Sequence, residues 1–155
     1  MESMGLFDGD TVSIKGKRGK STVVTVATLG EADVSALADS SKGGLAMSSD
    51  TMRNAGVRAG DKVTVVPAPD VKFGKAILIL PYGDSLASAK LEPADETVFS
   101  NYLKPYFEGK FRTLHRGDSF QIDGPAGKLD FQCVEIDSVE VDGDTACVVV
   151  DDTVI

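Results

Sequence analysis

The stretch Leu6-Phe7-Asp8-Gly9-Asp10-Thr11-Val12-Ser13-Ile14 joins a Gly-Asp pair to a run in which every second residue is apolar. The pattern returns at Val57–Val65 and at Leu114–Ile122, with Gly-Asp in the equivalent place. Glycine adopts backbone angles that other residues avoid, and an aspartate carboxylate accepts hydrogen bonds from turn amides. The alternation that follows has the period of a half-buried strand. Each copy therefore predicts a tight turn leading into a strand, and the recurrence predicts a β-barrel built from related pieces.

Length and composition narrow the class of protein. The chain has 155 residues, 42% of them apolar, so it can bury a core as one domain or as two small lobes. It carries 24 acidic and 16 basic residues, which argues against a nucleic-acid or anionic-membrane surface. The longest apolar run, at 76–80, suits a buried strand and is too short to span a membrane. Because residues 1–6 lack the apolar core of a signal peptide, a cytosol-like compartment is expected.

No catalytic or metal-binding pattern stands out. Cys133 and Cys147 lie in strand-like segments and are expected to be buried, reduced thiols. With His115 as the single histidine, they cannot complete a zinc site of nitrogen and sulfur ligands. The Gly-Asp pairs lack the ligand spacing of calcium loops, and Gly19-Lys20-Ser21 lies between two predicted strands, where a phosphate-binding loop does not belong. The sequence therefore predicts a chain without catalytic residues, metal or cofactor of its own.

The predicted elements form two lobes. Residues 1–82 are predicted as a first lobe, residues 83–93 as a linker and residues 94–155 as a second lobe. The expected strands are 11–15, 21–28, 61–66, 75–80, 118–123, 128–136 and 146–150, and the expected helices are 51–55 and 95–107. We expect 75–80 to be a central strand of the first lobe, because it is apolar on both faces. Pro105 should end or kink the longer helix, and Asp142-Gly143 should form a hairpin turn between the last two strands.

Three phenylalanines do not follow the alternation of strands or the spacing of helices. Phe7, Phe73 and Phe111 each lie in a predicted turn or at the end of an element. Aromatic residues in such places either form a small core between two lobes or line a binding cleft. Both interpretations stay open at this point.

Four segments taken together carry a family resemblance. They are Leu6-Phe7-x-Gly9-Asp10-Thr11-Val12, Pro67-x-Pro69-Asp70-Val71-Lys72-Phe73-Gly74-Lys75, Tyr102-Leu103-Lys104-Pro105-Tyr106-Phe107 and Asp152-Thr153-Val154-Ile155. In this order they resemble the N-terminal domain of the valosin-containing protein family, the cell-division-cycle group of hexameric AAA ATPases that extract and unfold ubiquitylated proteins. The resemblance implies a mainly β fold with short helices: a double-psi β-barrel lobe, then a small β-barrel lobe with a leading helix.

The resemblance also implies a function. In the family this domain recruits ubiquitin-linked adaptors and substrates for a segregase or chaperone that serves ubiquitin-dependent protein degradation. The implied partners are UBX-type domains, short linear motifs and ubiquitin, together with the AAA ring in cis and a full-length homohexamer. ATP and Mg²⁺ would bind to downstream ATPase modules, and the location would be cytoplasmic or nuclear, with an organelle-targeted paralogue as an alternative. The residues matching the interlobe adaptor-binding cleft are Phe7, Asp10, Thr25, Ala27, Pro69, Lys72, Phe73 and Phe111.

Three features depart from the family pattern. Thr25 and Ala27 stand where large aliphatic residues usually line the cleft, which implies a shallower or wetter slot. Asp123 stands where an arginine commonly faces the first ATPase ring, which implies a different docking on that ring. The strand that precedes Leu6 in the family has no counterpart, so the barrel's first strand is expected to be missing. The alternatives are the N domain of a membrane-fusion or peroxisomal AAA protein, a ubiquitin-binding cofactor of the same fold, and a double-psi-barrel enzyme.

Overall fold

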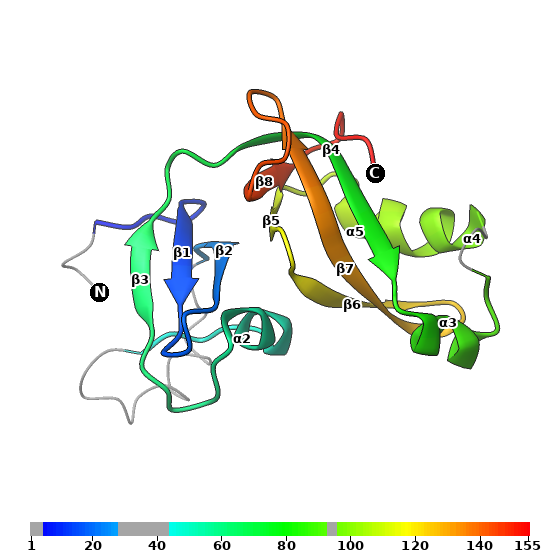
Figure 1. Ribbon diagram of the computed structural model, residues 1–155, viewed down its shortest axis with the longest axis horizontal. Helices are drawn as coiled ribbons and strands as arrows, with labels where there is room; N and C mark the ends of the chain where they lie inside the picture. Colours follow the sequence, from blue (N-terminus) through cyan, green and yellow to red (C-terminus); the bar gives the residue numbers. More distant parts are fainter. Residues whose placement is uncertain (1–4, 28–43, 93–95) are drawn as a thin grey trace. The chain divides into compact units, whose positions relative to one another are not determined.

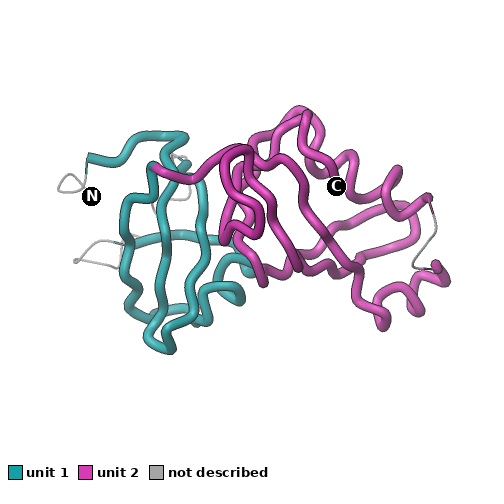
Figure 2. The backbone as a smooth tube through the Cα atoms, turned by 45° about the horizontal axis from the view of Figure 1, so that its top comes forward, with its two compact units in different colours: residues 1–69 teal, residues 70–155 magenta. Residues whose placement is uncertain are grey.

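The computed structural model (Figure 1) describes residues 5–27, 44–92 and 96–155, and it is mainly β with short helices. The chain divides into two compact units, Met1–Pro69 and Asp70–Ile155 (Figure 2). Each unit has its own cluster of buried apolar side chains. We describe the units one at a time.

Unit 1 is a three-stranded antiparallel sheet with one helix in its described part. Its order is β2-β1-β3, with β1 at Thr11–Lys15, β2 at Ser21–Thr25 and β3 at Thr64–Pro67. The helix α2 spans Ser49–Ala55; the Ser48 hydroxyl caps its start and Gly56, at φ 66°, ends it. The core consists of Val12, Ile14, Ala55 and Val57. Thr28, the predicted end of the second strand, lies outside the described residues.

The Gly-Asp repeats form one recurring turn, as predicted. Asp10, Asp61 and Asp118 each accept a hydrogen bond from the backbone N–H three residues earlier, at 2.9, 2.9 and 3.1 Å. The backbone N–H of each aspartate donates to the carbonyl of that same earlier residue, at 3.1, 3.0 and 2.9 Å. The intervening glycines have φ of 92°, 87° and 90°, the left-handed region that a type II turn requires at this position.

Two of these turns also join a partner strand through a β-bulge. The N–H of Gly9 donates to the carbonyl of Val26, and the N–H of Val26 donates to the carbonyl of Asp10, both at 2.8 Å. In unit 2, Gly117, Asp118 and Cys133 repeat this arrangement at 2.8 and 2.9 Å. In each case the glycine and the aspartate of one strand lie opposite a single residue of the partner strand. Because the first of the two is a glycine with positive φ, the arrangement is a G1 bulge. The bulge sets the register of both hairpins that follow, β1–β2 in unit 1 and β6–β7 in unit 2.

Unit 2 contains a five-stranded sheet that curls into a half-barrel. Its order is β5-β8-β4-β7-β6. The strands span Lys72–Pro81 (β4), Arg112–His115 (β5), Ser119–Gly124 (β6), Gly127–Ser138 (β7) and Ala146–Val149 (β8). Only the β4–β8 pairing is parallel among the named strands of this sheet. Phe131, Leu129, Cys133, Ile136 and Val149 are fully buried on its inner side.

The long helix of unit 2 runs through Pro105 without ending there. It is built from α4 (Glu96–Val98), a π-helical turn (Phe99–Leu103, labelled η1) and α5 (Lys104–Phe107). Proline lacks an N–H and its ring collides with the carbonyl four residues earlier, and the wider π turn relieves that collision. The N–H of Lys104 accordingly donates to the carbonyl of Phe99, five residues back. Asp95, the predicted start of the helix, lies outside the described residues.

Three of the predicted boundaries differ from the structure. Strand β4 pairs with β7 and β8, so the strand predicted at 75–80 belongs to unit 2, and the units divide after Pro69 instead of at 82. The predicted linker contains a helix, α3 (Gly83–Ala89). Asp142-Gly143 forms a turn, but β7 and β8 are not a hairpin, because β4 lies between them in the sheet. Local alternation identified the strands, whereas their partners depend on long-range pairing that no local pattern records.

The turn geometry predicts how glycine replacements change stability. Gly117→Ala should lower the free energy of unfolding by about 1–2 kcal/mol, because a side chain is strained at its φ of 90°. Gly83→Ala is the matched control in the same unit, since its added Cβ meets no atom within 4 Å and its φ is not positive. Urea denaturation of both variants measures the difference. Equal midpoints for the two would contradict the assigned turn.

Candidate functional site

The predicted adaptor-binding residues divide between the two units. Unit 1 contains Phe7, Asp10, Thr25, Ala27 and Pro69, and unit 2 contains Lys72, Phe73 and Phe111. All three phenylalanines are exposed, at 74%, 54% and 74%, and none belongs to the core of its own unit. Within each unit, these side chains are therefore surface residues and not part of the packing.

Phe7 and Asp10 are joined by the first Gly-Asp turn. The carboxylate of Asp10 accepts the N–H of Phe7 at 2.9 Å, and the N–H of Asp10 donates to the carbonyl of Phe7 at 3.1 Å. These two bonds fix the backbone of Phe7 while its ring remains exposed. Asp10 therefore stabilises the turn, and its predicted pairing with a partner's arginine would be a second role.

Thr25 and Ala27 are exposed, and the register explains the orientation of Thr25. Val24 pairs with Val12 of the core, so Thr25, the next residue in β2, lies on the opposite face. Ala27 follows Val26, the residue held by the first bulge. Pro69, the last residue of unit 1, is also exposed.

In unit 2, the sheet register places Phe73 and Phe111 on the same face. Phe73 of β4 pairs with Val148 of β8, which pairs in turn with Thr113 of β5. Paired residues share a face, and residues two apart along a strand do as well, so Phe111 lies on the face of Thr113, one pleat away. This face is opposite to the buried Leu114 and Val149. The two exposed aromatic side chains thus share one face of a single unit, with β8 between them.

The segment that carries Phe111 is held by specific contacts. The N–H of Gly109 donates to the Asp151 carboxylate at 2.9 Å. Arg112 lies over the ring of Tyr106, 3.8 Å from its centroid, and its Nε donates to the Tyr106 carbonyl at 2.7 Å. A cation over an aromatic face together with a charged hydrogen bond restricts the start of β5. The ring of Phe111 is therefore exposed on an ordered backbone.

Two further residues adjoin Phe73: Val139, and Lys72, which precedes Phe73 in β4 and lies on the other face because it pairs with the buried Cys147. Lys72 Nζ lies 3.4 Å from Glu140 Oε1, and both side chains are partly exposed, so the ion pair contributes little to stability. The N–H of Val139 donates to the carbonyl of Phe73 at 3.0 Å, which places the exposed Val139 beside it. Val139 was not among the predicted site residues, because the sequence pattern of 137–145 is that of a connection between two strands of a hairpin. The apolar Val139 and Val141 within an acidic run were the available signal.

Two of the four family-like segments contact each other in unit 2. Thr153 Oγ1 donates to the Gly74 carbonyl at 2.7 Å and accepts the N–H of Val150 at 3.0 Å. A Cβ on Gly74 would lie 3.0 Å from Thr153 Cγ2 and 3.1 Å from Cys147 Sγ, so a side chain there would be crowded. The C-terminal segment therefore supports the strand start that carries Lys72 and Phe73.

The remaining candidates for chemistry have structural explanations. Both cysteines are free and buried, and burial raises the pKa of the Cys133 and Cys147 thiols to about 12. Asp123 is exposed on β6, opposite Lys128 on β7. Within the described ranges, no group of three or more histidine, cysteine, aspartate or glutamate side chains is arranged to hold a metal ion. The helices of the described part are too short or too polar to cross a membrane.

No family model matches the chain.

The raised thiol pKa predicts the pH dependence of stability. Because the folded state keeps both thiols protonated above the ordinary value of 9.0, their contribution is present below pH 9 and is lost as the pH rises toward about 12. Replacing both by alanine should therefore flatten the fall in unfolding free energy over that range. The native thiols should also resist a disulfide exchange reagent at pH 8 and react after addition of urea. Rapid modification of the native protein would contradict the assigned burial.

Proposed function

We propose that this chain is the N-terminal recruiting domain of a hexameric AAA unfoldase of the valosin-containing protein family. The observation that carries the proposal is the pair of exposed rings, Phe73 and Phe111, on one face of unit 2, at positions that match adaptor-binding positions of the family. Exposed aromatic residues on an ordered backbone are typical anchors of protein–protein interfaces. UBX-type domains, short linear motifs and ubiquitin are the proposed partners.

The fold is compatible with this proposal at a coarser level. A mainly β unit with Gly-Asp turns, followed by a curled sheet with short helices, supports the proposed succession of a double-psi β-barrel lobe and a small β-barrel lobe. The contact between Gly74 and Thr153 gives a physical reason for two of the family-like segments to occur together. The double-psi topology itself remains part of the proposal.

In this proposal the chain binds partners and the chemistry resides elsewhere. ATP and Mg²⁺ would be bound by ATPase modules of the same polypeptide, and the AAA ring would be a partner in cis within a homohexamer of the cytoplasm or nucleus. The N domain of a membrane-fusion or peroxisomal AAA protein is the second candidate. A UBX domain as the test partner separates the two, because the proposal requires it to bind.

The first test replaces the aromatic anchor of unit 2. Phe73→Ala should weaken binding of a UBX domain by about 1–3 kcal/mol, the usual range for a buried aromatic anchor. Leu80→Ala is the matched control, since Leu80 lies on the same strand, is exposed to a similar extent (49% against 54%) and is outside the predicted set. Calorimetry measures both affinities, and circular dichroism checks that the variants are folded. Equal affinities for the folded wild type and Phe73→Ala would refute the proposed site.

The second test restores apolar bulk in unit 1. Thr25→Ile combined with Ala27→Leu should strengthen binding of the same UBX domain, because each added side chain offers apolar contact worth about 1–2 kcal/mol. Thr64→Ile, at an exposed threonine of β3 outside the predicted set, is the control for added surface hydrophobicity. Unchanged affinity in the folded double variant would show that these two positions do not shape the site.

A further inference from the structure

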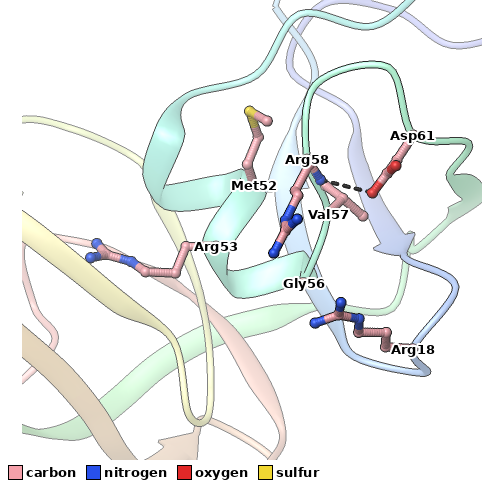
Figure 3. A pocket seen from close by; sticks show the side chains of 7 residues that line it. All are labelled: Arg18, Met52, Arg53, Gly56, Val57, Arg58 and Asp61. Atoms are coloured by element: carbon pink, nitrogen blue, oxygen red, sulfur yellow. Dashed lines mark hydrogen bonds between the residues drawn. The ribbon is translucent and has the colours of Figure 1, made fainter.

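Unit 1 has a depression of about 340 Å³ at the end of α2 (Figure 3). All of its lining residues belong to unit 1: Arg18, Met52, Arg53, Gly56, Val57, Arg58 and Asp61. Val57 belongs to the core of the unit and Met52 packs against that core, so the depression has an apolar part. The volume is at the lower end of the range for ligand sites and is large enough for one or two side chains.

Arg18 and Arg58 reach this depression from different segments. Arg18 lies in the loop between β1 and β2, and Arg58 lies in the turn that follows α2. Both side chains are exposed, and no salt bridge joins either guanidinium to a carboxylate of the described residues. Figure 3 shows both near Gly56, on the same side of the helix end.

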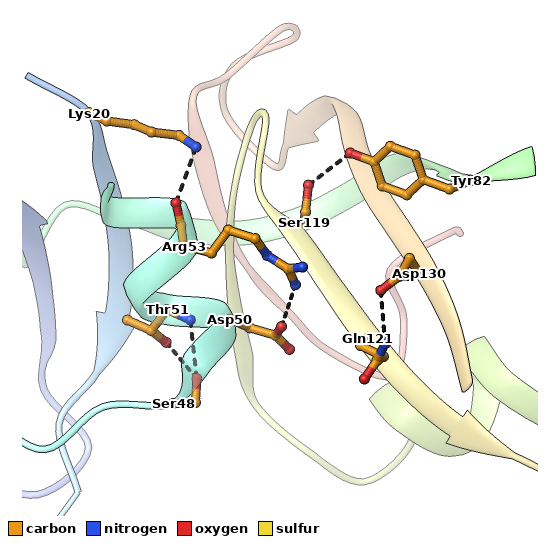
Figure 4. Close-up of polar contacts among 9 residues, drawn as sticks. All are labelled: Lys20, Ser48, Asp50, Thr51, Arg53, Tyr82, Ser119, Gln121 and Asp130. Carbon is orange, nitrogen blue, oxygen red and sulfur yellow. Dashed lines mark hydrogen bonds and ion pairs between the residues drawn. The ribbon is translucent and has the colours of Figure 1, made fainter. Parts of the chain in front are cut away.

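Two described carboxylates at or next to the depression, those of Asp61 and Asp50, have partners of their own. Asp61 accepts the backbone N–H of Arg58 at 2.9 Å in the second Gly-Asp turn. Asp50 pairs with Arg53 at 2.5 Å, one helical turn away (Figure 4). Both carboxylates remain negatively charged, but three arginines and one aspartate line the depression, so positive charge is in excess there. Among the described residues, neither Arg18 nor Arg58 is in a salt bridge that would neutralise it.

The helix end does not account for the arginines either. A helix C-terminus attracts cations through its free carbonyl groups. Here the N–H groups of Gly56 and Val57 donate to the carbonyls of Arg53 and Met52, and Lys20 Nζ donates to the Arg53 carbonyl at 3.2 Å. The carbonyls of Met52 and Arg53 thus have partners, and the side-chain cation bonded to the helix end is Lys20.

The charge of the chain is unevenly distributed between the units. Unit 1 contains eight basic and eight acidic residues, whereas unit 2 contains eight basic and sixteen acidic residues, so the net charge of −8 comes from unit 2. The excess of arginine over aspartate at this depression therefore forms a local positive field on a unit that is neutral overall. Such a field attracts an acidic partner and increases its association rate.

We propose that this depression is a docking site for an acidic peptide segment of a partner protein. Carboxylates of the segment pair with Arg18 and Arg58, because guanidinium groups bind carboxylates through paired hydrogen bonds. An apolar side chain between the carboxylates contacts Met52 and Val57. The apolar part favours a peptide over a bare anion, and a neutral unit lacks the extended basic face that a nucleic acid requires. The site involves unit 1 alone and does not depend on the function proposed above.

The test uses a fluorescein-labelled peptide, Glu-Asp-Glu-Leu-Glu-Asp-Glu, and the whole chain. Fluorescence anisotropy should show saturable binding, and binding should weaken at higher salt because the contacts are ionic. Arg18→Gln combined with Arg58→Gln should weaken binding about tenfold, the loss expected for two exposed charged contacts. Lys110→Gln combined with Lys128→Gln removes the same charge from exposed positions of unit 2 and should leave affinity within about twofold.

Two further measurements distinguish the peptide site from a simple anion site. Replacing the peptide's leucine by serine should weaken binding about threefold or more, because the contact with Met52 and Val57 is lost. Inorganic phosphate should compete only at concentrations at which salt alone has the same effect. Equal binding by the serine peptide, an equal loss in the lysine variant, or no saturable binding by the folded wild type would each overturn the proposal. Loss of a UBX domain's binding in the Phe73→Ala variant has no bearing on this site.

Discussion

The hydrogen bond between an aspartate carboxylate and the backbone N–H three residues earlier is the interaction on which the rest of the structure depends. It closes the same turn at Asp10, Asp61 and Asp118, each time around a glycine with φ near 90°. At two of these turns the glycine and aspartate also oppose a single residue of the returning strand. Because side chains alternate between faces, this bulge determines which residues of the β1–β2 and β6–β7 hairpins become buried.

The sequence was informative wherever structure follows from local chemistry. The Gly-Asp turns, most strands and both buried cysteines could be predicted, because turn residues and alternation act within a few positions. The partner of strand β4 could not be predicted, since its apolar residues fit a central strand of either lobe. The π turn before Pro105 was missed for a related reason: a proline signals a collision, while the way the helix relieves it depends on how Tyr102 and Phe107 pack.

For the candidate site, too, the individual residues could be predicted from local patterns, whereas their arrangement in space depends on long-range strand pairing. Phe7, Phe73 and Phe111 could be singled out because they broke the periodicity of their surroundings, and the structure places all three on the surface of their units. That Phe73 and Phe111 lie on one face follows only from the register through Val148, and Val139 comes beside them only through a backbone bond. Neither relation has a signature in the sequence, because each joins residues more than thirty positions apart.

In the repeated turn, the backbone and the aspartate carboxylate form the structure, and the first side chain of the turn is left free to vary. In each copy the residue that donates to the aspartate carboxylate has its backbone held by two hydrogen bonds, while its side chain is not needed for the turn. That position holds Phe7 in the first copy, Arg58 in the second and His115 in the third. A phenylalanine there suits an apolar partner and an arginine suits an acidic one. The same Gly-Asp turn thus carries chemically different side chains at one position. The proposed docking positions can therefore differ in specificity while the fold around them stays the same.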